Sequence, residues 1–179
     1  MEKNIEVEIR SFISKEKYNY LLNFFKNLNT SFSEDYQETY YLDSKEDLRI
    51  CKTNDNAILL LKKGKIHDSF REEIEIKLNK EEFYNLNKIF SLLGFKIKVK
   101  FYRKRSQFKL GEVKVCLDYT KGYGYIIELE KMSSKSNKEK TLTILKEKLD
   151  ELKIPLTPKE EFDEKFKYYM KNWEILIKE

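Results

Sequence analysis

The feature that most constrains the fold is the alternation of charged and apolar side chains in Glu6-Val7-Glu8-Ile9-Arg10, near the N-terminus. Successive side chains of a β-strand point to opposite faces, so a strand here carries three charges on one face and two apolar residues on the other. Alone, this pattern is typical of an ordinary amphipathic strand with one face in water. One such strand therefore says little about function.

The same alternation recurs in four further segments. Several strands whose charged faces belong to one sheet can direct those faces toward a shared interior instead of bulk solvent. We therefore interpret the five segments together as the lining of one charged cavity. The other four are Arg71-Glu72-Glu73-Ile74-Glu75-Ile76-Lys77, Arg103-Lys104-Arg105, Lys114-Val115-Cys116-Leu117-Asp118 and Glu128-Leu129-Glu130.

The rest of the chain predicts an α+β fold in a single domain over residues 1–179. Strands are expected over about 5–10, 39–43, 48–51, 57–63, 70–78, 96–109, 112–118 and 125–131, and residues 29–38 are expected to form a polar connection. Helices are expected over about 15–28, 79–94, 137–152 and 158–177. Their expected starts are Ser14, Asn79 with Glu82, Ser136 with Glu139, and Thr157-Pro158 with Glu160.

A weak internal repeat supports closure of the sheet. Glu6-x-Glu8-x-Arg10, a helix and charged strands are echoed by Glu73-x-Glu75-x-Lys77, a helix and further charged strands. Two such halves can close an eight-stranded antiparallel β-barrel about one ligand wide, with the helices packed outside. The last two helices are expected to cover this barrel.

Charges that point into such a barrel need partners. Burying an unpaired ion costs several kcal/mol, and clustered carboxylates repel one another. The interior is therefore expected to be wet and to suit a polyanion that carries divalent cations, because carboxylates ligate Mg²⁺ or Mn²⁺ and arginines grip phosphate oxygens. The acidic side chains are Glu6, Glu8, Glu73, Glu75, Asp118, Glu128 and Glu130, and they oppose Arg10, Arg49, Lys63, Arg71, Arg103 and Arg105.

Composition narrows the class of protein. Although 37% of the residues are charged, 36 basic residues are interleaved with 31 acidic ones, so the chain has no basic tail of the nucleic-acid kind. Cys51 and Cys116 lie in expected strands, which indicates reduced thiols in a cytoplasmic protein. We expect neither a signal peptide nor a membrane span. Metal binding by cysteine and histidine is disfavoured, because the only histidine, His67, lies in an expected loop.

Eight motifs in order resemble the CYTH superfamily, the triphosphate tunnel metalloenzymes, and are most similar to class IV adenylyl cyclases with their archaeal and bacterial relatives. The resemblance covers about residues 5–131. No single motif is specific, and the specificity comes from their order. They are Glu6-x-Glu8-x-Arg10, Tyr41-Leu42-Asp43, Leu48-Arg49, Lys63-Gly64, Ser69-x-Arg71-Glu72-Glu73-x-Glu75, Arg103-x-Arg105, Leu117-Asp118 and Gly122-Tyr123-Gly124-Tyr125-x-x-Glu128-x-Glu130.

This resemblance implies a triphosphate-binding tunnel and assigns roles to its lining. Metal-ligating positions are Glu6, Glu8, Glu73, Glu75, Asp118, Glu128 and Glu130, and the catalytic set is Glu6, Glu8, Arg10 and Asp118. Phosphate-binding positions are Arg10, Arg49, Arg71, Arg103, Arg105 and a lysine at 62 or 63. The family's first motif usually ends in lysine, so Arg10 fits a phosphate clamp better than a general base. Counting from Arg49 points to Lys62, but a turn at Asn54 can absorb one residue, and we expect Lys63.

The resemblance leaves several functions open. The first expectation is an adenylyl cyclase that converts ATP to cyclic AMP and pyrophosphate with Mg²⁺ or Mn²⁺. The second is a phosphohydrolase acting on thiamine triphosphate or inorganic tripolyphosphate, and the third is a non-catalytic sensor of triphosphate or polyphosphate. A nucleic-acid interface is disfavoured, although Lys98, Lys100 and Lys104 accompany Arg103 and Arg105. The oligomeric state stays open, with a homodimer among the options.

Overall fold

The computed structural model describes residues 5–28, 31–66 and 68–178, so the loop expected at His67 lies outside the described residues. The α+β fold is confirmed. The strands are β1 (Ile5–Ile13), β2 (Phe32–Leu42), β3 (Asp47–Lys52), β4 (Asn56–Lys63), β5 (Phe70–Asn79), β6 (Ile97–Leu110), β7 (Val113–Thr120) and β8 (Gly124–Ser133). The helices are α1 (Lys15–Asn27), α2 (Glu82–Leu92), α3 (Lys138–Glu151) and α4 (Lys159–Leu176).

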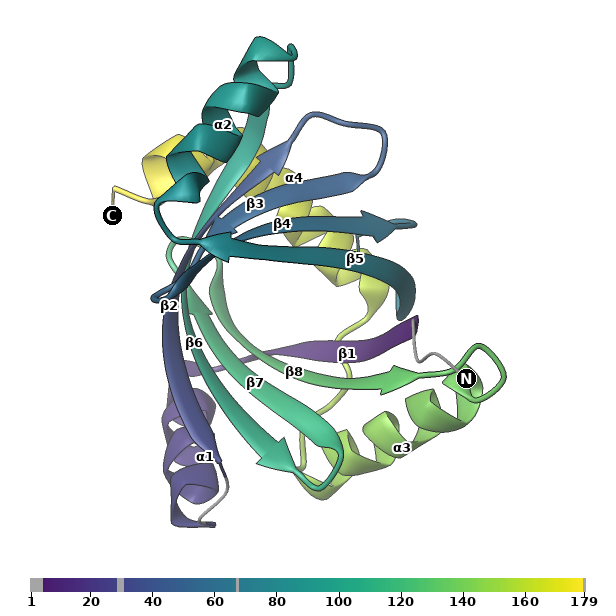
Figure 1. Ribbon diagram of the computed structural model, residues 1–179. Coiled ribbons are helices and arrows are strands. Elements are labelled where there is room, and N and C mark those ends of the chain that lie inside the picture. The colour runs from purple at the N-terminus through teal and green to yellow at the C-terminus, as the bar shows by residue number, and fades with distance from the viewer. Residues whose placement is uncertain (1–4, 29–30, 67, 179) are drawn as a thin grey trace.

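All strand pairs are antiparallel, and the sheet closes on itself in the order β1-β5-β4-β3-β2-β6-β7-β8 (Figure 1). The expected barrel is therefore confirmed. Exchanging β1–β4 with β5–β8 leaves this order unchanged, as expected for two related halves. The two edges of β1 differ, however: β1 pairs with β8 from Ile5 to Ile13, but with β5 only from Ile5 to Val7.

The outward faces of β1, β7 and β8 are apolar because their charged residues take the alternate positions. Val7, Val115 and Leu129 of these strands pack against α1 and α3, where Phe25 and Leu145 are fully buried. Each fully buried apolar side chain of this size contributes about 1.5–3 kcal/mol relative to exposure. These two helices therefore hold the outside of the barrel while its charged positions face inward.

The other two helices pack in different ways. Phe83 of α2 is buried against Tyr40 and Ile50 on the outside of β2 and β3. In contrast, α4 places Phe162 and Phe166 against a cluster that includes Tyr41 and Phe101, which alternate with outward-facing residues of β2 and β6. Seen through the barrel in Figure 1, α4 crosses behind it, so this helix covers one end of the interior.

Several expected boundaries need correction. The segment 29–38 was expected to be a connection, but β2 begins at Phe32, because its polar first half pairs in register with the long β6 from Phe32↔Phe108 onward. Ser14 does cap α1, accepting a hydrogen bond from the Lys17 amide at 3.1 Å. The expected start of α4 is confirmed, since Pro158 is its N-cap. The expected caps of α2 and α3 are wrong, because their N-caps are Glu81 and Asn137 and neither makes a side-chain hydrogen bond there.

Gly122 tests how tightly α4 is held against the barrel. Its φ of +70° is left-handed, and a Cβ there would lie 2.6 Å from Cβ of Leu176, in α4. Gly111 has a similar φ of +62° but open space around it. We expect Gly111→Ala to cost about 1–2 kcal/mol of unfolding free energy from backbone strain, and Gly122→Ala to cost about twice that, measured by chemical denaturation. Equal losses would contradict the close contact.

Candidate active site

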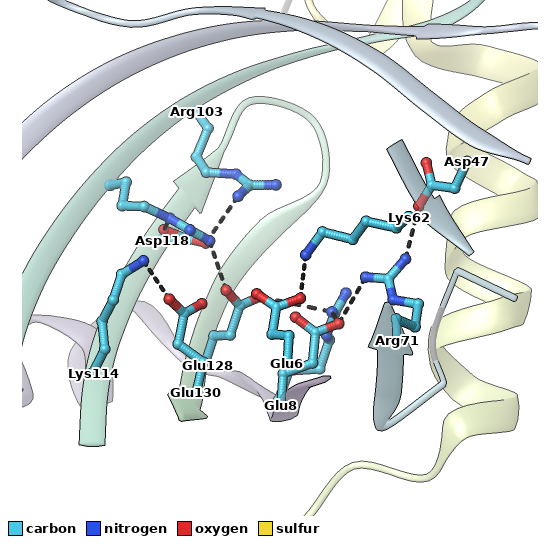
Figure 2. A network of polar contacts seen from close by, with 12 residues as sticks. Glu6, Glu8, Asp47, Lys62, Arg71, Arg103, Lys114, Asp118, Glu128 and Glu130 are labelled. Atoms are coloured by element: carbon cyan, nitrogen blue, oxygen red, sulfur yellow. Dashed lines mark hydrogen bonds and ion pairs between the residues drawn. The ribbon is translucent and has the colours of Figure 1, made fainter. Parts of the chain in front are cut away.

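Charged side chains from β1 and from β3 to β8 converge inside the barrel (Figure 2). Their positions follow from strand alternation, because each is two residues from another charged side chain or opposite one across a strand pair. The structure thus brings together most of the residues expected from the sequence. They are Glu6, Glu8, Arg10, Arg49, Lys62, Arg71, Glu73, Arg103, Arg105, Asp118, Glu128 and Glu130, joined by Asp47 and, at the rim, Lys114.

Arg105 is the centre of one group of ion pairs. Its Nε and one terminal nitrogen donate to the two carboxylate oxygens of Asp118 at 2.8 and 2.6 Å, and the same terminal nitrogen donates to Glu128 at 3.0 Å. Burial alone would lower the pKa of Arg105, but Asp118 holds it well above its ordinary value. Burial likewise opposes ionisation of Glu128, yet Arg105 and Arg10 hold its pKa well below the usual range. Both side chains are therefore charged at neutral pH.

Arg71 is the centre of a second group, and it is almost fully buried. One terminal nitrogen donates to Asp47 at 2.7 Å and the other to Glu8 at 2.8 Å. Asp47 also accepts a hydrogen bond from Nε of Arg49 at 2.7 Å, so one carboxylate orients two guanidinium groups. Sequence analysis missed Asp47 because the strand was expected to begin at residue 48. The alternation Asp47-x-Arg49 is the signal that could have identified it.

The carboxylates of Glu6, Glu8 and Glu130 form an acidic cluster, with one oxygen atom from each lying within 4.8 Å of the others. Burial raises the pKa of Glu6 to about 8, with Glu8 and Glu73 acting in the same direction and Lys62 against them. Burial and Glu128 raise the pKa of Glu130. A divalent cation would relieve this repulsion, and a set of hard oxygen donors suits Mg²⁺ or Mn²⁺.

The prediction that Lys63 faces the interior is wrong by one residue, because Lys62 does so instead. Lys62 is buried and forms ion pairs with Glu6 and with Glu73, the latter at 2.7 Å from Nζ to Oε2. Lys63 lies on the outer surface, with 55% of its side chain exposed, next to Glu72. The hairpin absorbs no extra residue: Asp47 pairs with Lys62 and Arg49 with Leu60, and partners across a strand pair share a face.

One other sequence expectation also changes. Glu75 was expected to ligate metal, but it is exposed and pairs with Lys77 at 3.4 Å, because it lies farther along β5 than the acidic cluster. In contrast, the basic run of β6 is split between two faces, as strand alternation predicts. Arg103 and Arg105 point inward to Asp118, whereas Lys104 points outward and lies 3.1 Å from Glu34.

Ion pairs occupy most of the interior, and the remaining space is divided into small cavities. One of about 230 Å³ lies at the open mouth, beside Glu6, Lys114 and Glu130. Another of about 30 Å³ lies deeper, beside Arg10, Arg103 and Glu128, where it meets Phe162 of α4. The arrangement thus presents carboxylates and guanidinium groups together inside one barrel, with small cavities beside them.

Comparison with known proteins agrees with this geometry. Residues 4–172 match the CYTH domain. The chain belongs to the CYTH family. A protein of Methanocaldococcus jannaschii named "Putative adenylate cyclase" is 32% identical over 162 residues, which cover 84% of this chain and 90% of that protein. CYTH domains bind triphosphate substrates, and this membership indicates an enzyme.

Solved structures show the same fold. A conserved hypothetical protein of Pyrococcus furiosus is 25% identical with a TM-score of 0.70, over 84% of this chain and 91% of that chain. A Hippeastrum protein, described as an adenylyl cyclase candidate with a dominant triphosphatase activity, is 22% identical with a TM-score of 0.61, over 84% of this chain and 88% of that chain. None of the helices in the described part of the CYTH chain is long and apolar enough to span a membrane.

The raised pKa of Glu6 predicts a pH-dependent stability. A carboxyl group that holds its proton more tightly when folded destabilises the protein as pH rises from about 4.5 to about 8. In metal-free buffer, Glu6→Gln should therefore gain unfolding free energy relative to the wild type between pH 5 and pH 9, by on the order of 3 kcal/mol. Urea denaturation across this range measures the difference.

Glu75→Gln is the matched control, because it changes the same residue type outside the acidic cluster. A difference between Glu6→Gln and the wild type that stays constant with pH would mean that Glu6 is ionised throughout. The close pairing of Glu6 with Lys62 would then outweigh its burial.

Proposed function

We propose that this protein is a divalent-metal-dependent enzyme that binds a nucleoside triphosphate in the barrel and converts ATP to cyclic AMP and pyrophosphate. The observation that carries the proposal is the acidic cluster of Glu6, Glu8 and Glu130 lying beside a set of buried cations. The name of the relative from M. jannaschii supports the choice of a cyclase. The residues for phosphate binding are Arg10, Arg49, Lys62, Arg71, Arg103 and Arg105.

The carboxylates and the guanidinium groups of the channel have different roles in this proposal. Glu6, Glu8 and Glu130 would hold Mg²⁺ or Mn²⁺, with Glu73, Asp118 and Glu128 nearby, and the metal would supply positive charge that stabilises a transferring phosphoryl group. The guanidinium groups bind the non-bridging phosphate oxygens and orient the chain of phosphates. In cyclisation, the ribose 3′-hydroxyl attacks the α-phosphorus and pyrophosphate leaves.

Arg10 fits phosphate binding and not proton transfer. Burial opposes its charge, but Glu8 and Glu128 raise its pKa above the ordinary arginine value. Its guanidinium therefore stays protonated and cannot accept the hydroxyl proton. It lies on β1 beside Phe162 of α4, where it can contact a phosphate group.

A second candidate is hydrolysis of thiamine triphosphate or inorganic tripolyphosphate, in which water attacks the terminal phosphorus. The triphosphatase activity named for the Hippeastrum protein favours it. Both reactions would use the same cations and carboxylates, because each depends mainly on stabilising a transferring phosphoryl group.

Product analysis separates the candidates. The protein is incubated with Mg²⁺ or Mn²⁺ and with ATP, thiamine triphosphate or tripolyphosphate, and the products are resolved by chromatography. Cyclic AMP with pyrophosphate is the expected result, and EDTA should abolish it. Release of orthophosphate together with ADP, thiamine diphosphate or pyrophosphate, and without cyclic AMP, would indicate the hydrolase. Binding without turnover would indicate a sensor and overturn both enzymatic functions.

Lys62 and Lys63 provide a matched pair for the phosphate-binding channel. Lys62→Gln removes a buried cation and should weaken binding of tripolyphosphate by about tenfold to a hundredfold, the range expected for a charge-assisted contact of about 1.5–3 kcal/mol. Lys63→Gln changes the same residue type on the outer surface and should bind as the wild type does. Isothermal titration calorimetry measures both, and an effect of Lys63→Gln equal to that of Lys62→Gln would contradict the inward placement of Lys62.

A further inference from the structure

A cavity of about 210 Å³ lies beside β1 where the barrel wall is incomplete, and we call it the side cavity. Beyond Val7 no residue pair joins β1 to β5 in the described chain, and the last main-chain contact is the Glu8 amide donating to the Ser69 carbonyl at 3.1 Å. The linker between α3 and α4 lies along the free edge of β1 instead. The Phe12 amide donates to Oγ1 of Thr157, and the Thr157 amide donates to Oγ of Ser11, both at 3.0 Å.

The side cavity combines apolar walls with a polar rim. Ile9, Leu142, Leu156 and Phe162 supply apolar surface, and Leu156 is 43% exposed. Asp68 and Lys159, which form an ion pair, and Lys146 supply the polar groups at the rim. Such a combination is typical of sites for small organic ligands with a few hydrogen-bonding groups.

The side cavity is next to the charged channel. Glu8 and Arg10 line it, although their charged groups belong to the network inside the barrel. Arg10 and Phe162 also line the inner cavity of about 30 Å³, and the guanidinium carbon lies 5.9 Å from the centre of the Phe162 ring. Because Arg10 and Phe162 line both cavities, a phosphate bound to Arg10 would have the side cavity beside it as space for an attached organic group.

We propose that the side cavity binds the nucleoside of a nucleoside triphosphate whose phosphates lie in the channel, an inference that rests on the proposed function. The apolar walls suit a flat heterocycle, and the rim offers an acceptor at Asp68 and a donor at Lys159. The charge of the rim decides which organic group fits better, a neutral base or the cationic ring of thiamine. Lys146 and Lys159 outnumber Asp68, so the rim favours a neutral base over the cationic ring of thiamine.

Filling the side cavity tests this proposal. Leu156→Trp enlarges a partly exposed side chain outside the core clusters, so the fold should be kept, and thermal melting checks this. The probes are methylene-bridged analogues of ATP and of tripolyphosphate, titrated in Mn²⁺. We expect Leu156→Trp to weaken binding of the ATP analogue by about tenfold or more and to leave the tripolyphosphate analogue unchanged. Leu156→Ala, which keeps the cavity open, should weaken the ATP analogue less.

Thr143→Trp is the control, because Thr143 is exposed on α3 and does not line the cavity. Equal affinity of Leu156→Trp and the wild type for the ATP analogue would overturn the inference, as would an equal loss for both analogues. Failure of the wild type to bind either analogue would overturn the proposed function itself. The two failures are therefore distinguishable.

Discussion

The structure depends on the requirement that a charge removed from water must have a partner. Breaking a buried ion pair by removing one member costs about 3–5 kcal/mol, because the remaining charge stays uncompensated. Arg71 illustrates this requirement, since it is almost fully buried and lies between Asp47 and Glu8. The charged side chains of an alternating strand can therefore point inward only if other strands supply side chains of opposite charge at the same level along the barrel axis.

Closure of the sheet brings those partner side chains to the same level inside the barrel. The two halves of the chain follow the same order of strands, but their charges have diverged. Lys62 on β4 occupies the strand that corresponds to β8, which carries Glu128 and Glu130. A nearly symmetric order of strands thus carries an asymmetric distribution of charge. Carboxylates are concentrated on β1 and β8, and cationic side chains come from β3, β4, β5 and β6.

Strand alternation was enough to predict the barrel and most of its lining, because the side-chain period of two decides which residues share a face. It was not enough where one residue of register matters. Which of Lys62 and Lys63 points inward depends on the exact register of the β3–β4 hairpin. Asp47 is the first residue of β3, and residue preferences for strands locate a strand end only approximately. Glu75 shows the other limit: strand alternation gives the face of β5 on which a residue lies but not how far along the barrel the acidic cluster lies. The polar first half of β2 forms a strand only because β6 pairs with it.

The mutual pairing of carboxylates and guanidinium groups has a consequence for how two ligands would share the channel. Glu8 and Glu128 each neutralise arginines that phosphates would also need. A divalent cation that draws the carboxylates away leaves those guanidinium groups available, and an anion that engages the guanidinium groups leaves the carboxylates available. Each ligand thereby lowers the cost of admitting the other, so metal and triphosphate are expected to enter with positive cooperativity, with equal coupling in both directions.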